Sequence, residues 1–243
     1  MKLSQILSGV DYSGRIEKDV EIEDIVYDSR KAKDGVIFVC LSGLKADGHN
    51  FAKSAYDNGA RVFVVEKDVS LPSDAQVFTV KNSRAVLRAL GDNLFRKPEN
   101  EIKVIGITGT KGKTTVAHLV QKILNASGIP TGIIGTVGAE FDGMKLPTAN
   151  TTPESLELQR IFRAMLDKGC KAVALEVSSL GVKHGRVDGI QFAAGVFTNL
   201  SPDHIGPLEH DTFEEYAYWK SVLFEHCDTA VMNYDDEAYK IMK

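Results

Sequence analysis

The sequence lacks several features that would assign it to a class at once. It has no run of about 18 apolar residues, so insertion into a membrane is not expected. Its three cysteines have no C-x-x-C or metal-ligand spacing, which indicates reduced thiols in a cytoplasmic protein. It has no run of Lys and Arg, and its net charge is −4, so nucleic-acid binding is not expected. What remains is a globular chain of 243 residues, 43% hydrophobic and 26% charged.

Apolar runs that alternate with helical patterns predict two α/β units with mostly parallel sheets. For the first unit, residues 1–98, we expect strands at 36–41, 61–66 and 76–80, and a helix at 83–95. For the second unit, residues 99–243, we expect strands at 103–108, 131–135, 172–177, 192–198 and 229–233, and helices at 113–127, 153–168 and 212–226. The polar segment 96–100, with Pro98, is the expected linker. The abrupt end after a strand suggests that the second unit continues in a longer protein.

Residues 101–125, EIKVIGITGTKGKTTVAHLVQKILN, carry the strongest functional signal. They predict a strand, a glycine-rich turn and a helix that begins at Lys113. Backbone N–H groups of such a turn, a helix N-terminus and a Lys together bind phosphate. Ile107 stands where the general pattern G-x-x-x-x-G-K-[ST] has its first glycine. An ordinary glycine-rich turn is the alternative, but GKTT directly after a buried strand favours a nucleotide phosphate. The helix residues expected to pack on the sheet are Val116, Leu119, Val120, Ile123 and Leu124.

Polar residues also follow other expected strands, at the sheet edge where ligands bind in open α/β folds. Glu176 of ALEVSS would face the phosphate loop and hold Mg2+, although a solvent-facing Glu is the alternative. FTNLSPDHIG supplies Asp203 and His204, which either ligate a metal or form an exposed turn. Thr152, before a proline, predicts a helix N-cap or an anion site. Lys220 is either a buried amine or, as its spacing alone favours, a stem whose charge reaches solvent.

Together these motifs resemble the Mur ligases, the ATP-dependent amino-acid-adding enzymes of peptidoglycan synthesis. The resemblance covers nearly the whole chain through DSR, ADGHNF, GTKGKTT, NTTP, EVSS, GRV, FTNLSPDH and WKSVLF, in family order. ADGHNF with NTTP and EVSS is most similar to the members that add the third residue of the peptide. The resemblance implies a small N-terminal α/β UDP-binding domain, followed by a P-loop-type ATPase domain that is truncated here.

The resemblance also implies roles for individual residues. ATP would be bound by Gly109, Thr110, Lys111, Gly112, Lys113, Thr114 and Thr115. Mg2+ would be held by Thr114, Glu176, His204 and Lys220, the last as a carbamylated lysine. The catalytic residues would be Lys113, Lys220, His204 and Glu176. The uridine diphosphate part of the substrate would contact Ser29, Leu44, Lys45 and Ala46. Its sugar–peptide part would contact Asn150, Thr151, Thr152, Ser178 and Arg186.

The sequence departs from the family pattern in three places. Lys111 stands where Asn is usual, Leu180 stands where His usually follows EVSS, and the segment IGPLEH after His204 differs. The family's C-terminal domain, which selects the amino acid, is not found in the sequence.

The implied reaction begins when ATP phosphorylates the terminal carboxylate of UDP-N-acetylmuramoyl-L-alanyl-D-glutamate. A free amino acid then attacks the acyl phosphate. We expect a monomer that binds the UDP precursor but forms no tripeptide as this chain alone. Three alternatives are a folylpolyglutamate or cyanophycin-type synthetase, a non-catalytic nucleotide-binding module, and a P-loop kinase or GTPase. The first would not carry DSR and ADGHNF, and no guanine-reading motif supports the last.

Overall fold

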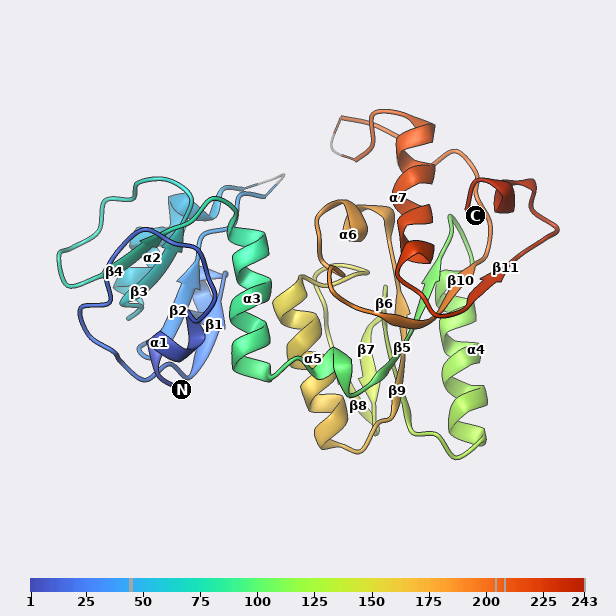
Figure 1. The fold of residues 1–243 in the computed structure, drawn as a ribbon, viewed down its shortest axis with the longest axis horizontal. Coiled ribbons are helices and arrows are strands. Elements are labelled where there is room, and N and C mark those ends of the chain that lie inside the picture. The colour runs from blue at the N-terminus through green and yellow to red at the C-terminus, as the bar shows by residue number, and fades with distance from the viewer. Residues whose placement is uncertain (44–45, 204, 208, 243) are drawn as a thin grey trace. The chain divides into compact units, whose positions relative to one another are not determined.

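The computed structural model describes residues 1–43, 46–203, 205–207 and 209–242, and its elements form two compact units. The first unit comprises residues 1–96 and the second residues 97–243 (Figure 1). Both are α/β units, as the alternation of apolar runs and helical patterns predicts. None of the helices in the described residues is both long and apolar enough to cross a membrane.

The first unit is built on a four-stranded parallel sheet in the order β1-β2-β3-β4. Its strands are β1 (Asp24–Val26), β2 (Val36–Val39), β3 (Val62–Val65) and β4 (Gln76–Thr79). Its helical segments are α1 (Leu3–Ile6), η1 (Ser29–Lys31), η2 (Gly48–Phe51), α2 (Ala52–Asp57) and α3 (Ser83–Phe95). The residues of β2 and β3 are all buried, as expected for apolar β-branched runs in a sheet that is covered on both faces.

The second unit is built on a seven-stranded sheet in the order β11-β10-β5-β9-β6-β7-β8. Its strands are β5 (Lys103–Thr108), β6 (Thr131–Gly135), β7 (Gly138–Phe141), β8 (Met144–Leu146), β9 (Ala172–Glu176), β10 (Phe192–Phe197) and β11 (Ala230–Met232). Its helical segments are η3 (Pro98–Asn100), α4 (Lys113–Ala126), α5 (Ser155–Asp167), α6 (Ser179–Lys183), α7 (Phe213–Glu225) and η4 (Glu237–Lys240). All pairs from β11 to β6 are parallel, whereas β7 and β8 pair antiparallel at one edge.

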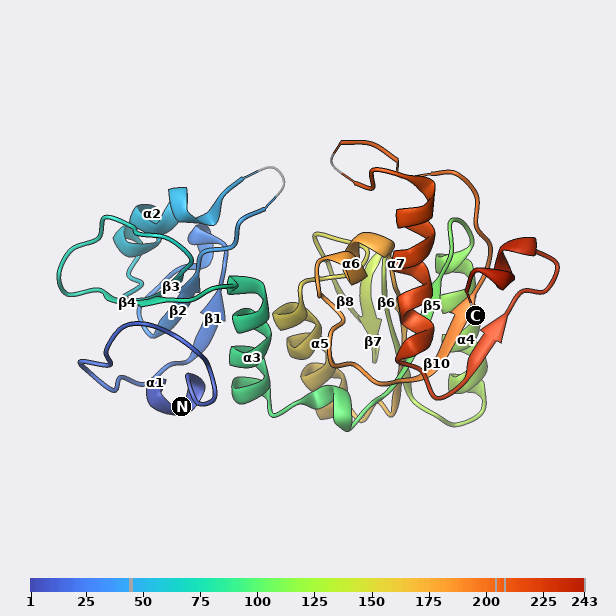
Figure 2. The ribbon, with the colours of Figure 1, turned by 45° about the horizontal axis from the view of Figure 1, so that its top comes forward.

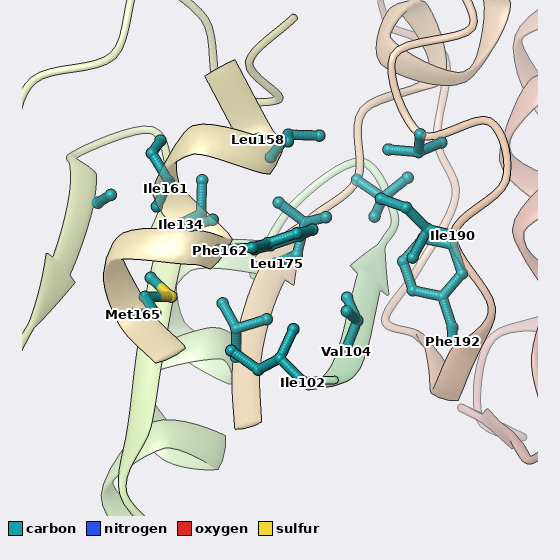
Figure 3. Close-up of a cluster of buried hydrophobic side chains, with 14 of the residues drawn as sticks. Ile102, Val104, Ile134, Leu158, Ile161, Phe162, Met165, Leu175, Ile190 and Phe192 are labelled. Carbon is teal, nitrogen blue, oxygen red and sulfur yellow. The ribbon is translucent and has the colours of Figure 1, made fainter. Parts of the chain in front are cut away.

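Helices α4 and α5 cover opposite faces of this sheet (Figures 1 and 2). Successive strand residues point to opposite faces, so Ile133 packs in the cluster under α4 whereas Ile134 packs in the cluster under α5. Phe162 and Met165 of α5 fill the centre of the larger cluster, against Leu175 of β9 (Figure 3). The parallel strands are therefore buried on both sides, and their carboxyl ends meet at one edge.

The packed face of α4 agrees with the prediction at Val116 and Val120 but not at Leu119 and Ile123. Leu119 and Ile123 are 53% and 62% exposed, and the buried contact is made by Ala117, flanked by Val116 and Val120. A residue two positions along a helix is rotated by about 200°, so a contact centred on Ala117 turns Leu119 away from the sheet. The small alanine side chain lets the helix backbone approach the strands.

The start of α5 is also different from the prediction. The helix begins at Ser155, and its N-cap residue Glu154 makes no capping hydrogen bond with its side chain. The Thr152 hydroxyl donates instead to the carbonyl of Glu176, 2.9 Å away, and accepts from the N–H of Ser178. Thr152 is therefore part of the sheet edge and not the cap of a helix.

Candidate functional site

The turn after β5 is held tightly against the end of β10. Gly109 has a φ of 140°, and a Cβ there would lie 2.0 Å from the Thr198 hydroxyl oxygen, so only glycine fits. Gly112 has a φ of 85° but open space around it, so it is required by backbone conformation alone. The turn then enters α4 at Lys113. We call residues 109–112 with the first turn of α4 the phosphate loop.

Asn199 fixes the phosphate loop through the loop backbone. Its side-chain oxygen accepts from the N–H of Lys111, its side-chain N–H2 donates to the carbonyl of Lys111, and both distances are 2.9 Å. Its own carbonyl accepts from the N–H of Thr110 at 2.8 Å. Because only backbone atoms of Lys111 take part and its side chain is exposed, the departure from Asn at this position leaves the loop intact. The N–H groups of the first turn of α4, which lack partners within the helix, remain to meet an anion.

The Lys113 amine lies within the loop. It donates to the carbonyls of Gly109 and Thr110 at 2.8 and 3.0 Å. Burial lowers the pKa of the amine, while Glu176 and Asp203 oppose that shift. The cation that the sequence places on a phosphate is thus held by the loop's own carbonyls in this structure.

Glu176, at the carboxyl end of β9, faces the start of α4. It is 1% exposed, and its carboxylate accepts from the Thr114 hydroxyl at 3.0 Å. It also accepts from the N–H and hydroxyl of Thr136 at 3.1 and 3.2 Å. A solvent-facing Glu is therefore excluded. Gly135 makes room for it, because a Cβ there would lie 2.0 Å from the carboxylate. Neither Thr136 nor Gly135 is predicted as a site residue by the sequence, because no motif marks them and their role depends on the pairing of β6 with β9.

The Thr114 and Glu176 oxygens fit a magnesium ion that also binds phosphate. Mg2+ has octahedral geometry with ligands at about 2.1 Å, so adjacent ligands lie about 3 Å apart, and these two oxygens are 3.0 Å apart. Among the described residues there is no cluster of three or more His, Cys, Asp or Glu side chains suited to a metal. A small protein donor set is what Mg2+ uses when phosphates and water complete its shell. His204, the predicted further ligand, lies outside the described residues.

Lys220 of α7 is buried beside the same loop. It is 2% exposed, and its amine donates to the carbonyl of Gly109 at 3.0 Å, so the solvent-reaching stem that its spacing favours is wrong. The amine also lies 4.4 Å from the centre of the Tyr216 ring. Burial, together with the nearby charge of Lys113 and against the opposing charge of Asp203, lowers the pKa of Lys220 to about 7. Lys113 and Lys220 therefore share one carbonyl acceptor.

The NTTP and EVSS segments meet next to Glu176. The Thr151 and Thr136 hydroxyls are 3.2 Å apart, and the Thr152 and Ser178 hydroxyls are 3.0 Å apart. Thr152 is fully buried, so its geometry suits a residue that holds the segment in place. Asn150 is half-buried at the start of the same segment.

Arg186 is joined to this segment from the other side. Its guanidinium pairs with Glu154 at 3.1 Å and donates to the carbonyl of Thr152 at 3.0 Å. These contacts place a cation beside the NTTP backbone. The structure thus brings Arg186 together with the other residues that we expect to bind the sugar–peptide part.

The residues expected to contact uridine diphosphate lie in the first unit. Ser29 begins η1, whose N-cap Asp28 accepts from the N–H and guanidinium of Arg30. The carbonyl of Ala46 accepts from the N–H of Gly43 at 2.9 Å, which closes the loop 43–46. Leu44 and Lys45, within that loop, lie outside the described residues.

Asp47 and His49 support that loop. The His49 Nε2 accepts from the N–H of Glu66 at 2.9 Å, so Nδ1 carries the proton and donates to Asp47 at 2.6 Å. Hydrogen bonds from Lys67 and His49 hold the pKa of Asp47 well below its usual range. The ADGHNF motif is thus an anchored turn, a role that its sequence does not reveal.

Family comparisons agree with this geometry. Residues 107–243 match the Mur ligase middle domain, and residues 21–108 match the model described as Mur ligase family, catalytic domain. A UDP-N-acetylmuramoyl-L-alanyl-D-glutamate–2,6-diaminopimelate ligase of Clostridium botulinum is 42% identical, over 100% of this chain and 51% of that protein. The chain spans about half the length of the curated relatives that it matches.

Solved structures show the same fold. The structure of a ligase with the same name as that relative aligns with a TM-score of 0.80 at 27% identity, over 100% of this chain and 49% of the other. A MurF ligase of Thermotoga maritima in complex with ADP aligns with a TM-score of 0.60 at 21% identity, over 92% of this chain and 48% of the other. The phosphate loop, the carboxylate and the buried lysine thus lie in a domain whose family is known, and the chain belongs to the Mur ligase family.

Proposed function

We propose that this chain supplies the UDP-precursor site and the ATP site of a ligase that adds the third amino acid to UDP-N-acetylmuramoyl-L-alanyl-D-glutamate. The observation that carries the proposal is the pairing of Thr114 with Glu176 at the start of α4, beside a buried Lys220 that is bonded to the phosphate loop. The relatives are named as 2,6-diaminopimelate ligases, and this chain covers about half of their length. Their names support 2,6-diaminopimelate as the amino acid.

The nucleotide would place its terminal phosphates at the first turn of α4. Its N–H groups and the positive end of the helix dipole favour an anion there. Lys113 would leave its two carbonyl acceptors to reach a phosphate oxygen. The complex of the Thermotoga maritima ligase with ADP supports a nucleotide in a domain of this fold.

Magnesium would be held by Thr114 and Glu176, with His204 and Lys220 as the further ligands implied by the family resemblance. Bound there, it would supply positive charge to the phosphate oxygens. The chain's own cations and dipoles would do related work, since the reaction brings a substrate carboxylate against a triphosphate. Lys113 and the N-terminus of α4 would offset that repulsion as the acyl phosphate forms and ADP leaves. The amine of the incoming amino acid would then displace phosphate and form the amide.

Lys220 would act as a carbamate. Its pKa of about 7 leaves a large fraction of the amine neutral near pH 7, and the neutral amine is the nucleophile. Its nitrogen would add to the carbon of CO2 and lose a proton to water, which replaces a cation by an anionic group. The short distance to the phosphate loop would place that group near the magnesium site.

The sugar–peptide part would be bound by Asn150, Thr151, Thr152, Ser178 and Arg186. The uridine diphosphate part would be bound by the first unit, through Ser29, Leu44, Lys45 and Ala46. Because Thr152 is buried, its role in binding the sugar–peptide part would be indirect. The charge of Arg186 would be partly neutralised by its pairing with Glu154.

We also propose that the protein is a cytoplasmic monomer.

The proposal is tested by calorimetric titration of the chain with MgADP and, separately, with UDP-N-acetylmuramoyl-L-alanyl-D-glutamate. We expect both to bind. A protein extended to the length of the relatives should release phosphate from ATP only when the UDP-dipeptide and an amino acid are both present. Absence of MgADP binding would refute the nucleotide site, and nucleotide binding without turnover in the extended protein would support a non-catalytic module instead.

A further inference from the structure

Tyr216 of α7 has a role that the proposed reaction leaves unassigned. It is 0% exposed, and its hydroxyl donates to the hydroxyl oxygen of Thr110 at 3.0 Å. Thr110 belongs to the phosphate loop, 106 residues earlier in the chain. The bond therefore joins α7 to the loop at a point that water does not reach.

The Thr110 hydroxyl is saturated by three partners. It donates to the carbonyl of Ser201 at 3.2 Å and accepts from the N–H of Ser201 at 3.0 Å, with Tyr216 as the second donor. A hydroxyl has one proton and two acceptor positions, so each is used once. The N–H of Thr110 is held by Asn199, and its carbonyl accepts from Lys113. The position of Thr110 therefore sets the position of a carbonyl that holds the Lys113 amine.

The Tyr216 ring also supports Lys220, one turn further along α7. The amine lies 4.4 Å from the ring centre, within the range of a cation–π contact when charged. Lys220 in turn donates to Gly109, the residue before Thr110. One side chain thus contacts both the phosphate loop and the lysine that is bonded to it.

His210 also packs on the Tyr216 ring. It is fully buried, its Nε2 lies 2.9 Å from the Ser179 hydroxyl, and its ring packs on that of Tyr216 with centres 5.5 Å apart. Ser179, the last residue of EVSS, begins α6. Tyr216 is thereby fixed between α6 and the phosphate loop, and its hydroxyl is aimed by packing.

We propose that Tyr216 is a positioning residue for the phosphate loop: its hydroxyl holds Thr110, and through it the loop, in the conformation that receives nucleotide phosphates. The inference depends on the proposed nucleotide site. Binding costs less free energy when the loop is already ordered. Loss of this hydrogen bond should therefore weaken the binding of nucleotide phosphates specifically. Tyr216 acts through Thr110 and has no contact of its own with the nucleotide.

The test is titration of the 243-residue chain with MgADP and with magnesium pyrophosphate, using Tyr216→Phe and the control Tyr218→Phe. Tyr218 lies on the same helix and is 53% exposed. We expect Tyr216→Phe to lower the affinity for both ligands about five- to tenfold, which corresponds to the loss of one net hydrogen bond. The control should stay within about twofold. Equal losses for the two ligands indicate that the effect is on the phosphates and not on the nucleoside.

Thr110→Val provides a second route to the same bond. If Tyr216 acts through Thr110, the double variant binds MgADP better than the two single losses combined would predict. Tyr216→Phe that lowers Tm yet binds MgADP as tightly as the unmodified chain would overturn the inference and indicate a purely structural side chain. Failure of the unmodified chain to bind MgADP would instead refute the proposed nucleotide site, and the inference with it.

Discussion

Two glycines of one loop provide a matched pair of substitutions whose effects should differ. In Gly112→Ala the new methyl group meets nothing within 4 Å, so only the positive φ is penalised. That penalty is about 1–2 kcal/mol. In Gly109→Ala the methyl group would lie 2.0 Å from the Thr198 hydroxyl and 2.9 Å from the carbonyl of Asn199. Overpacking adds about 1–3 kcal/mol to the backbone penalty, which gives a total of about 2–5 kcal/mol.

The chain offers a suitable assay, because its single Trp lies in the second unit. Trp219 is on α7 and packs against the larger core cluster, so its fluorescence in a urea titration reports the unfolding of that unit and not of the first. We expect Gly109→Ala to reduce the free energy of unfolding by at least about 1 kcal/mol more than Gly112→Ala does. Equal losses in the two variants would refute the close contact between Gly109 and the end of β10.

Four further results are expected. Glu176→Gln keeps partners for both threonines but removes the charge, so by titration calorimetry it should weaken ADP at least about tenfold with Mg2+ and little without it. In the unmodified chain, Lys220 binds a proton in the unfolded state up to its usual pKa near 10.5 but in the folded state only up to about 7, so stability should rise with pH in that window. Lys220→Met should flatten the rise in urea titrations across that window, and an unchanged slope would contradict burial of the amine. Asn199→Asp cannot donate to the carbonyl of Lys111, so Tm and ADP affinity should both fall. An ADP affinity equal to that of the unmodified chain would contradict the inference that Asn199 holds the phosphate loop in place. The chain alone should bind the UDP-dipeptide, and mass spectrometry should detect no tripeptide. Tripeptide formation would show that these 243 residues are sufficient to select and add the amino acid.

Several elements of both units could be predicted from sequence because their signals are local. The bounds of β5, β6 and α3 agree with the apolar patterns at 103–108, 131–135 and 83–95, where strand runs or helical periodicity are flanked by polar or turn residues. The β7–β8 hairpin is absent from the prediction because its strands are short and only half apolar. Asp142 and Gly143, both with positive φ, form a turn whose Asp-Gly sequence is a strong hairpin signal.

The site could be predicted only where a motif carries it. GTKGKTT and EVSS identify Thr114 and Glu176, but no pattern indicates that the Thr136 hydroxyl shares that carboxylate or that Asn199 binds the loop backbone. Such contacts depend on which strands are neighbours. The burial of Lys220 has the same origin, since spacing along α7 cannot reveal that the loop after β5 covers its amine. Tertiary pairing, and not local periodicity, determines these details.

The carbonyl of Gly109 has a consequence for affinity. The Lys113 amine already donates to this carbonyl and to that of Thr110. A phosphate that binds here therefore competes with two backbone carbonyls for the same ammonium group. Each binding event exchanges one set of electrostatic contacts for another, and only the difference contributes to the dissociation constant. The two carbonyls satisfy hydrogen bonds of the ammonium group without cancelling its charge, so the site favours a ligand whose contacts with that group outweigh both of these hydrogen bonds.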